Sequence, residues 1–181
     1  MKTDLTRRER MKMAHLIAAP ICALIFFSAP RLPAAEDAAA EDAAAVAYPE
    51  GYRAWRHVKS QVATQEHPRA ASIGGLHNIY ANEAAIAGYR GGKFPDGSVI
   101  VFDLLELHEK NGSLIPGARR WLGVMEKDSA KYAATGGWGF DNFSGDSRTD
   151  RDVPVNGPAS NCYACHLQQK DQDYVFSKLK D

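Results

Sequence analysis

The chain has 181 residues with 22 basic and 22 acidic side chains, and hydrophobic residues make up 45% of it. Without residues 1–35 it would keep 16 basic and 20 acidic residues, which is a net charge of −4. That balance argues against a nucleic-acid-binding protein, for which a concentrated basic face would be expected. The roughly 130 residues that follow the first 47 suit a single domain.

Residues 1–35 have the layout of a secretory signal peptide. A basic start precedes an apolar run from about Ala14 to Phe27, and small residues lead to a cleavage site near Ala34 or Ala35. The run is shorter than the roughly 20 residues of a membrane span, although an uncleaved anchor is an open alternative. Cys22, inside the run, has no lipid-attachment motif around it. We therefore predict a periplasmic protein without membrane attachment once the leader is removed.

Residues 36–47 are predicted to be a disordered linker. The five-residue sequence Ala-Glu-Asp-Ala-Ala occurs twice in succession, starting at Ala35 and at Ala40, and it offers no aromatic or branched side chain to bury. The globular domain is expected to cover residues 48–181.

Two short helices are predicted early in this domain. Tyr52, Trp55 and Val58 follow Pro49 at nearly helical spacing, which favours a first helix. Residues 84–89 favour a second helix, which the pair Gly91-Gly92 would end.

The remaining pattern predicts an antiparallel meander of strands. The turn sequence of residues 95–97 leads into residues 98–107, the segment richest in β-branched residues, and Asn111-Gly112 turns the chain back. Further strands are expected at residues 121–125 and 138–143. The predicted fold class is therefore α+β, an antiparallel β-sheet with flanking short helices in a single domain.

The C-terminal part is predicted to carry a haem. Residues 145–160 form a loop without periodicity, and residues 162–166 spell Cys-Tyr-Ala-Cys-His, the attachment signature of a c-type haem. Cys162 and Cys165 would form the two thioethers, and His166 would be the proximal ligand of the iron. Residues 167–179 are spaced for a terminal helix that would present His166 from its first turn. This is the C-terminal haem attachment helix.

Three other interpretations of the two cysteines fit less well. A thioredoxin-like redox pair would open a helix of a βαβ unit, and a structural zinc site normally needs four protein ligands. A structural disulfide is the third. Since the remaining cysteine lies in the leader, no second cysteine pair exists to complete a zinc site.

The sixth iron ligand is left open by the sequence. Met125 is the only methionine outside the leader, and core packing on a strand is its expected role. The further candidates are histidines in polar surroundings, which we expect to be ordinary surface residues: His57, His67, His77 and His108. Of these, His77, within Gly74-Gly-Leu-His-Asn-Ile-Tyr80, is the candidate that we single out. A five-coordinate iron is the expected state.

Several motifs together resemble the cytochrome P-460 family. They are Tyr48-Pro-x-Gly-Tyr-x-x-Trp55, Ile79-Tyr-Ala-Asn82, Phe94-Pro-Asp-Gly-Ser-Val-Ile-Val101, Trp138-Gly-Phe140 and the terminal pentad. The resemblance covers nearly all of the chain beyond the linker. It implies an antiparallel sheet with flanking helices, a homodimer, and one c-type haem with an open distal face.

Phe102 distinguishes this chain from the hydroxylamine-oxidising members of the family that it resembles. Those members cross-link a lysine to the porphyrin from the strand after the Asp-Gly turn, and Phe102 stands at that position. Phenylalanine there is similar to the cytochrome c′-beta subgroup, in which aromatic residues cap the distal side. Ile73 stands at the second cap position.

An apolar cap favours nitric oxide over dioxygen, because bound dioxygen gains from a hydrogen-bond donor beside the haem and nitric oxide depends little on one. Carbon monoxide is a second expected ligand. The first functional hypothesis is therefore a gas-binding protein without catalytic residues. The second is an enzyme that acts on hydroxylamine, nitrogen oxides or peroxide, and the third is an electron-transfer cytochrome with a sixth ligand.

Overall fold

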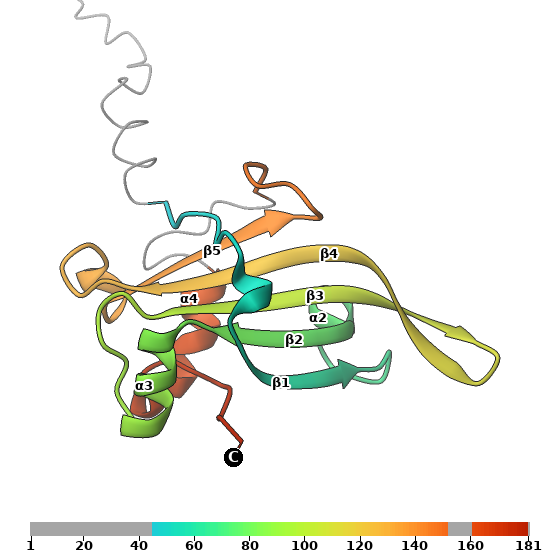
Figure 1. Cartoon of the computed structure of the whole chain (residues 1–181), viewed down its shortest axis with the longest axis horizontal. Coiled ribbons are helices and arrows are strands. Elements are labelled where there is room, and N and C mark those ends of the chain that lie inside the picture. The colour runs from blue at the N-terminus through green and yellow to red at the C-terminus, as the bar shows by residue number, and fades with distance from the viewer. Residues whose placement is uncertain (1–44, 152–160, 181) are drawn as a thin grey trace, which may run out of the picture. The chain divides into compact units, whose positions relative to one another are not determined.

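The computed structural model describes residues 45–151 and 161–180, so the predicted signal peptide, most of the predicted linker and part of the predicted loop lie outside the described residues. A five-stranded antiparallel sheet in the order β1-β2-β3-β4-β5 forms its centre (Figure 1). The strands are β1 (Arg56–Ala63), β2 (Gly75–Ala81), β3 (Val99–Lys110), β4 (Ser113–Lys127) and β5 (Trp138–Ser144). The predicted α+β class and the meander are confirmed.

Short helices flank the sheet. They are the 3-10 helices η1 (Tyr52–Ala54), η2 (Ala133–Thr135) and η3 (Leu167–Gln172), and the α-helices α2 (Ala70–Ile73), α3 (Glu83–Gly91) and α4 (Asn161–His166). The predicted second helix is confirmed as α3. It begins where the Asn82 side chain accepts a hydrogen bond from the Ala85 amide, and it ends at Gly92 with φ at 80°. Among the described residues, no helix is long and apolar enough to cross a membrane.

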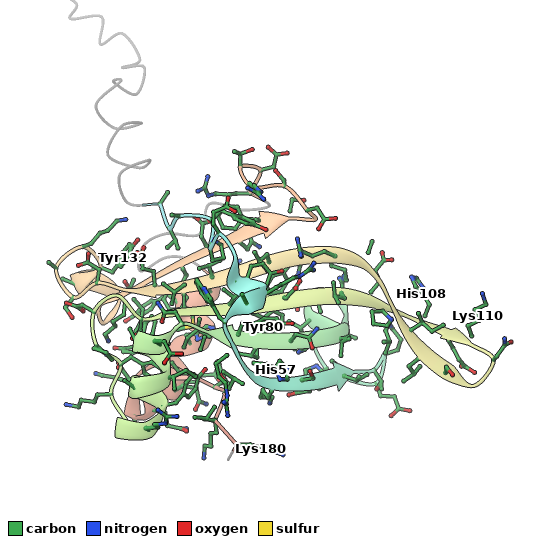
Figure 2. The ribbon with its side chains drawn as sticks, in the orientation of Figure 1. His57, Tyr80, His108, Lys110, Tyr132 and Lys180 are labelled. Atoms are coloured by element: carbon green, nitrogen blue, oxygen red, sulfur yellow. The ribbon has the colours of Figure 1, made fainter. Side chains whose placement is uncertain are left out.

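The predicted turn between β3 and β4 is also confirmed. Asn111 and Gly112 both have positive φ, at 53° and 73°, as a two-residue hairpin turn requires. The hairpin extends beyond the ends of the other strands (Figure 1). Figure 2 shows His108 and Lys110 on this extension.

The prediction of a helix from Pro49 to Val58 is wrong beyond its first turn. Helix η1 ends at Trp55, whose backbone is extended, and Val58 lies in β1. Residues 56–63 pair with β2 instead, and this pairing outweighs the helical spacing of three aromatic and branched side chains.

The predicted terminal helix is shifted towards the N-terminus. Helix α4 begins before the pentad and His166 is its last residue, while η3 ends at Gln172. Asp173 and Tyr174 have positive φ, at 49° and 65°, which stops any helix. The Asp173 carboxylate accepts hydrogen bonds from Lys127 Nζ at 2.8 Å and the Phe94 amide at 2.9 Å. These hydrogen bonds hold Asp173 in place and so stabilise the end of the helix at Gln172.

The sheet has two buried faces. The helix face carries alternate residues of the strands, among them Ile79, Ile100, Phe102, Met125 and Phe140, and it packs against α3, α4 and the C-terminal segment. The back face packs against the N-terminal segment around η1. Its buried residues form the second core cluster, which is Val46, Tyr52, Val101, Leu122, Val124, Tyr132 and Phe143.

Val46 lies within the segment predicted as a linker, and it is only 1% exposed. Packing against the back face therefore includes at least this residue before Tyr48. The predicted boundaries of the leader, linker and domain stay predictions.

A buried ion pair joins the strands on the back face. Arg119 Nε lies 2.8 Å from Asp103 Oδ1, and the side chains are 6% and 2% exposed. Tyr52 Oη donates to Asp103 Oδ2 at 2.6 Å, and burial together with this carboxylate raises the pKa of Tyr52. The network connects η1 to both long strands.

We predict that Asp103→Ala destabilises the protein by about 3–5 kcal/mol, because it removes the buried partner of the Arg119 guanidinium and leaves only Asp146, whose side chain is 84% exposed. Urea unfolding followed by circular dichroism measures the change. The control is Arg148→Ala, which breaks an ion pair with Glu50 whose side chains are 66% and 61% exposed. We expect that control to change the free energy of unfolding by under about 1 kcal/mol. Equal effects of the two substitutions would contradict the prediction.

Candidate haem site

The two cysteines of the pentad lie on one short helix beside the helix face. Both Cys162 and Cys165 are half-buried free thiols within α4. Cys162 and Tyr163 pack against the core cluster of the helix face. Burial, with a smaller contribution from Asp141, raises the pKa of the Cys162 thiol. Arg69 Nη1 lies 3.0 Å from Cys165 Sγ.

The His166 imidazole is held by one hydrogen bond and two rings. Its Nδ1 lies 2.7 Å from the Tyr174 carbonyl oxygen. Because a carbonyl only accepts, Nδ1 carries the hydrogen, and the lone pair of Nε2 remains for a metal. The ring centroid lies 5.0 Å from that of Phe140 and 5.1 Å from that of Phe176. Burial lowers the pKa of His166, which favours the neutral form that binds iron.

These residues fit a haem better than the alternatives. Two unpaired thiols, an oriented imidazole and apolar neighbours match what a c-type haem needs. In residues 45–151 and 161–180, no three His, Cys, Asp or Glu side chains come together as a metal site. The described residues therefore give no support to a closed zinc site.

Phe102 lies on the same face of the sheet as His166. Phe102 pairs with Ile79 on one side and Gly123 on the other, and Gly123 pairs with Asn142 of β5. Phe140, which the His166 ring contacts, lies two residues before Asn142 on the same strand. Phe102 and Phe140, the ring that the imidazole contacts, thus lie in adjacent rows of one sheet face.

An aromatic wall surrounds Phe102. Its ring stacks on Trp121 with centroids 4.9 Å apart and an angle of 18° between the planes. On the other side, the centroid of the His77 ring lies 4.7 Å from the centroid of the Phe102 ring. Sequence reasoning missed Trp121, although its pairing opposite Leu104 follows once the β3–β4 register is known.

The structure connects Ile73 to Phe102 through His77. Ile73 is the last residue of α2 and is half-buried. Its carbonyl oxygen is hydrogen-bonded to His77 Nε2. The two predicted cap residues therefore flank one imidazole, and their role as a cap stays a prediction.

His77 is not the surface histidine that was expected. It is 4% exposed, because its position in β2 points to the helix face. Burial lowers its pKa, and the positive groups near it, His67, Lys59 and Arg120, lower it further. The hydrogen bond to the Ile73 carbonyl acts in the opposite direction and raises the pKa of His77.

The other candidate sixth ligands lie in ordinary environments. His57 is exposed, His67 is half-buried, and His108 is paired with Glu106 on the hairpin. Figure 2 shows His57 on β1 and His108 far along the β3–β4 extension. Met125 is 8% exposed and packs in the core cluster of the helix face, as expected.

One polar side chain on the helix face is unsatisfied. Asn142 Oδ1 is fully buried and has no hydrogen-bond partner among the residues that the structure describes. It lies in the row of Phe102 and Gly123, two strands away from Phe102.

Helix α4, with its two free thiols and oriented imidazole, thus packs against the sheet face that also carries the aromatic wall. These are the features of a haem protein. The comparisons agree. The family model described as Cytochrome P460 matches residues 49–177, and the chain belongs to that family. No curated protein matches the chain. Membership implies a haem cofactor, and it does not distinguish gas binding from hydroxylamine oxidation.

The buried His77 predicts a pH dependence of stability. The unfolded imidazole binds a proton near pH 6.5, whereas the folded one resists protonation, so the free energy of unfolding falls as the pH drops below about 6.5. We predict that His77→Phe reduces this loss between pH 7.5 and pH 5. Urea titrations of the haem-loaded protein at both pH values measure it. His57→Phe, which removes an exposed histidine, should leave the pH dependence as in the original chain.

Proposed function

We propose that this chain is a periplasmic cytochrome c′-beta, a homodimeric protein with one covalent haem c that binds nitric oxide and other small gases such as carbon monoxide. The observation that carries the proposal is Phe102, an apolar ring on the helix face at the position of the cross-linking lysine. A phenyl ring offers no amine for a bond to the porphyrin. The proposed cap is Phe102 with Ile73.

The haem would be held from α4. Cys162 and Cys165 would bind the two vinyl groups, and His166 would bind the iron through Nε2. When bound, the haem supplies an iron with an open coordination position for a diatomic ligand. The Tyr174 carbonyl keeps the imidazole in the required tautomer and orientation, a second layer of support typical of metal-bound histidines.

The distal wall offers few free donors, which supports a preference for nitric oxide. Trp121 Nε1 already donates to the Ser72 carbonyl at 3.2 Å, and His77 Nε2 is bonded to the Ile73 carbonyl. A donor to a ligand is worth about 0.5–1.5 kcal/mol, so its absence lowers dioxygen affinity by up to roughly tenfold. Nitric oxide depends little on such a donor.

The same wall disfavours efficient peroxide chemistry. Cleavage of the O–O bond needs a positioned acid or base. His77 is the one titratable side chain in ring contact with Phe102 among the described residues. Its Nε2–H donates to the Ile73 carbonyl and burial lowers its pKa, so the ring keeps a lone pair on Nδ1 but offers no acid to the leaving oxygen.

The first test is the absorption spectrum of the purified ferrous protein, alone and with nitric oxide or carbon monoxide. We expect a five-coordinate, high-spin spectrum that changes on addition of each gas. A strongly red-shifted Soret band together with a haem–lysine adduct in the intact mass would instead indicate the hydroxylamine-oxidising type. Sharp low-spin bands without gas binding would indicate an electron carrier.

Covalent attachment is tested separately. We predict that Cys162→Ser leaves a single thioether and shifts the α band of the reduced pyridine haemochrome to longer wavelength. Replacement of both Cys162 and Cys165 by serine should abolish haem staining on a denaturing gel. Haem that survives denaturation in the double variant would contradict attachment at these residues.

A further inference from the structure

Four consecutive backbone carbonyls receive hydrogen bonds from side chains of the sheet. Arg120 donates from Nη2 to Ala71 at 2.7 Å and from Nη1 to Gly74. Trp121 Nε1 donates to the carbonyl of Ser72, and His77 Nε2 bonds that of Ile73. We call the three side chains the carbonyl clamp and residues 71–74 the clamped segment.

The clamp meets a local need of the backbone. Helix α2 has only four residues, and the last carbonyls of any helix lack partners within it. A single turn is unstable on its own, because nucleation fixes several residues for very few hydrogen bonds. The position of the clamped segment therefore depends on donors supplied by β2 and β4.

The clamped segment lies beside the candidate haem site. Ile73, one proposed cap residue, belongs to it. Two of the three clamp side chains, His77 and Trp121, contact the ring of Phe102, the other cap residue. Just before the segment, Arg69 reaches Cys165 of α4. The segment thus connects the attachment helix to the aromatic wall.

We infer that His77, Arg120 and Trp121 are positioning residues that hold residues 71–74 over the distal side of the haem and so limit how fast a gas reaches the iron. The inference rests on the proposed function. None of the three side chains needs to touch the ligand, because each acts through the segment that it holds.

The sharpest test removes two hydrogen-bond donors of the clamp and keeps an aromatic ring at each of the two positions. The double variant His77→Phe/Trp121→Phe loses two hydrogen bonds to the clamped segment and retains aromatic rings on both sides of Phe102. Each lost bond should raise the population of the released segment by about two- to tenfold. We therefore expect carbon monoxide to associate with the ferrous protein at least about fivefold faster after flash photolysis.

The matched control carries similar changes on neighbouring strand positions. His57 and Tyr80 pair across β1 and β2 outside the clamp, and Figure 2 shows both. The double variant His57→Phe/Tyr80→Phe should associate with carbon monoxide at the original rate. Arg120→Lys retains the charge but cannot bridge two carbonyls, and it should change the rate in the same direction as the clamp variant.

Hydrogen exchange separates this inference from the proposed function. Amides of residues 70–76 in the haem-loaded protein should exchange faster in the clamp variant than in the original chain and the control. Unchanged exchange overturns the inference, whatever the protein binds. Faster exchange with unchanged carbon monoxide kinetics shows that the segment does not limit access, which also overturns it. If the original protein binds no gas, the proposed function fails, and with it the part of the inference that concerns gas access.

Discussion

The pairing of β3 with β4 is the constraint on which the rest of the structure depends. Along β3, Phe102 and Asp103 point to opposite faces, as successive residues of a strand must. Phe102 joins the wall beside the haem site, while Asp103 enters the buried ion pair with Arg119. In β4 a register shift opposite Leu104 and Leu105 leaves Arg120 as an extra residue, so that Arg119 lies on the back face while Arg120 and Trp121 both reach the clamped segment. A slip of one residue would reverse both faces at once.

The parts that could be predicted from the sequence are those that local chemistry determines. The pentad predicts haem attachment through residue type and spacing, and that role stays a prediction. The turn at Asn111-Gly112 is confirmed, and it follows from backbone conformations that few other residues adopt. Helix α3 was predictable from its glycine end and its apolar face. In each case the signal lies within a few neighbouring residues.

The parts that were missed depend on contacts between distant segments. Residues 56–63 form a strand because β2 is available to pair with them, which no local spacing of Tyr52, Trp55 and Val58 reveals. His77 lies among residues that look ordinary, yet the register of β2 buries it between Phe102 and the end of α2. Trp121 joins the wall for the same reason. The four clamped carbonyls are backbone atoms, so the sequence carries no residue-type signal for them.

The position of the haem site relative to these contacts has a physical consequence. Side chains on a rigid central strand pair can be placed accurately, whereas a four-residue helix has little stability of its own. The hydrogen bonds that hold α2 to the strands are made to backbone carbonyls. The side chain at position 73 can therefore be replaced without loss of these bonds. His77 links this tie to pH, because a proton added to its buried ring would place a second positive charge near Arg120. The width of the distal side would then depend on the clamp, and its polarity on Phe102, so that two properties of one pocket come from separate parts of the sheet.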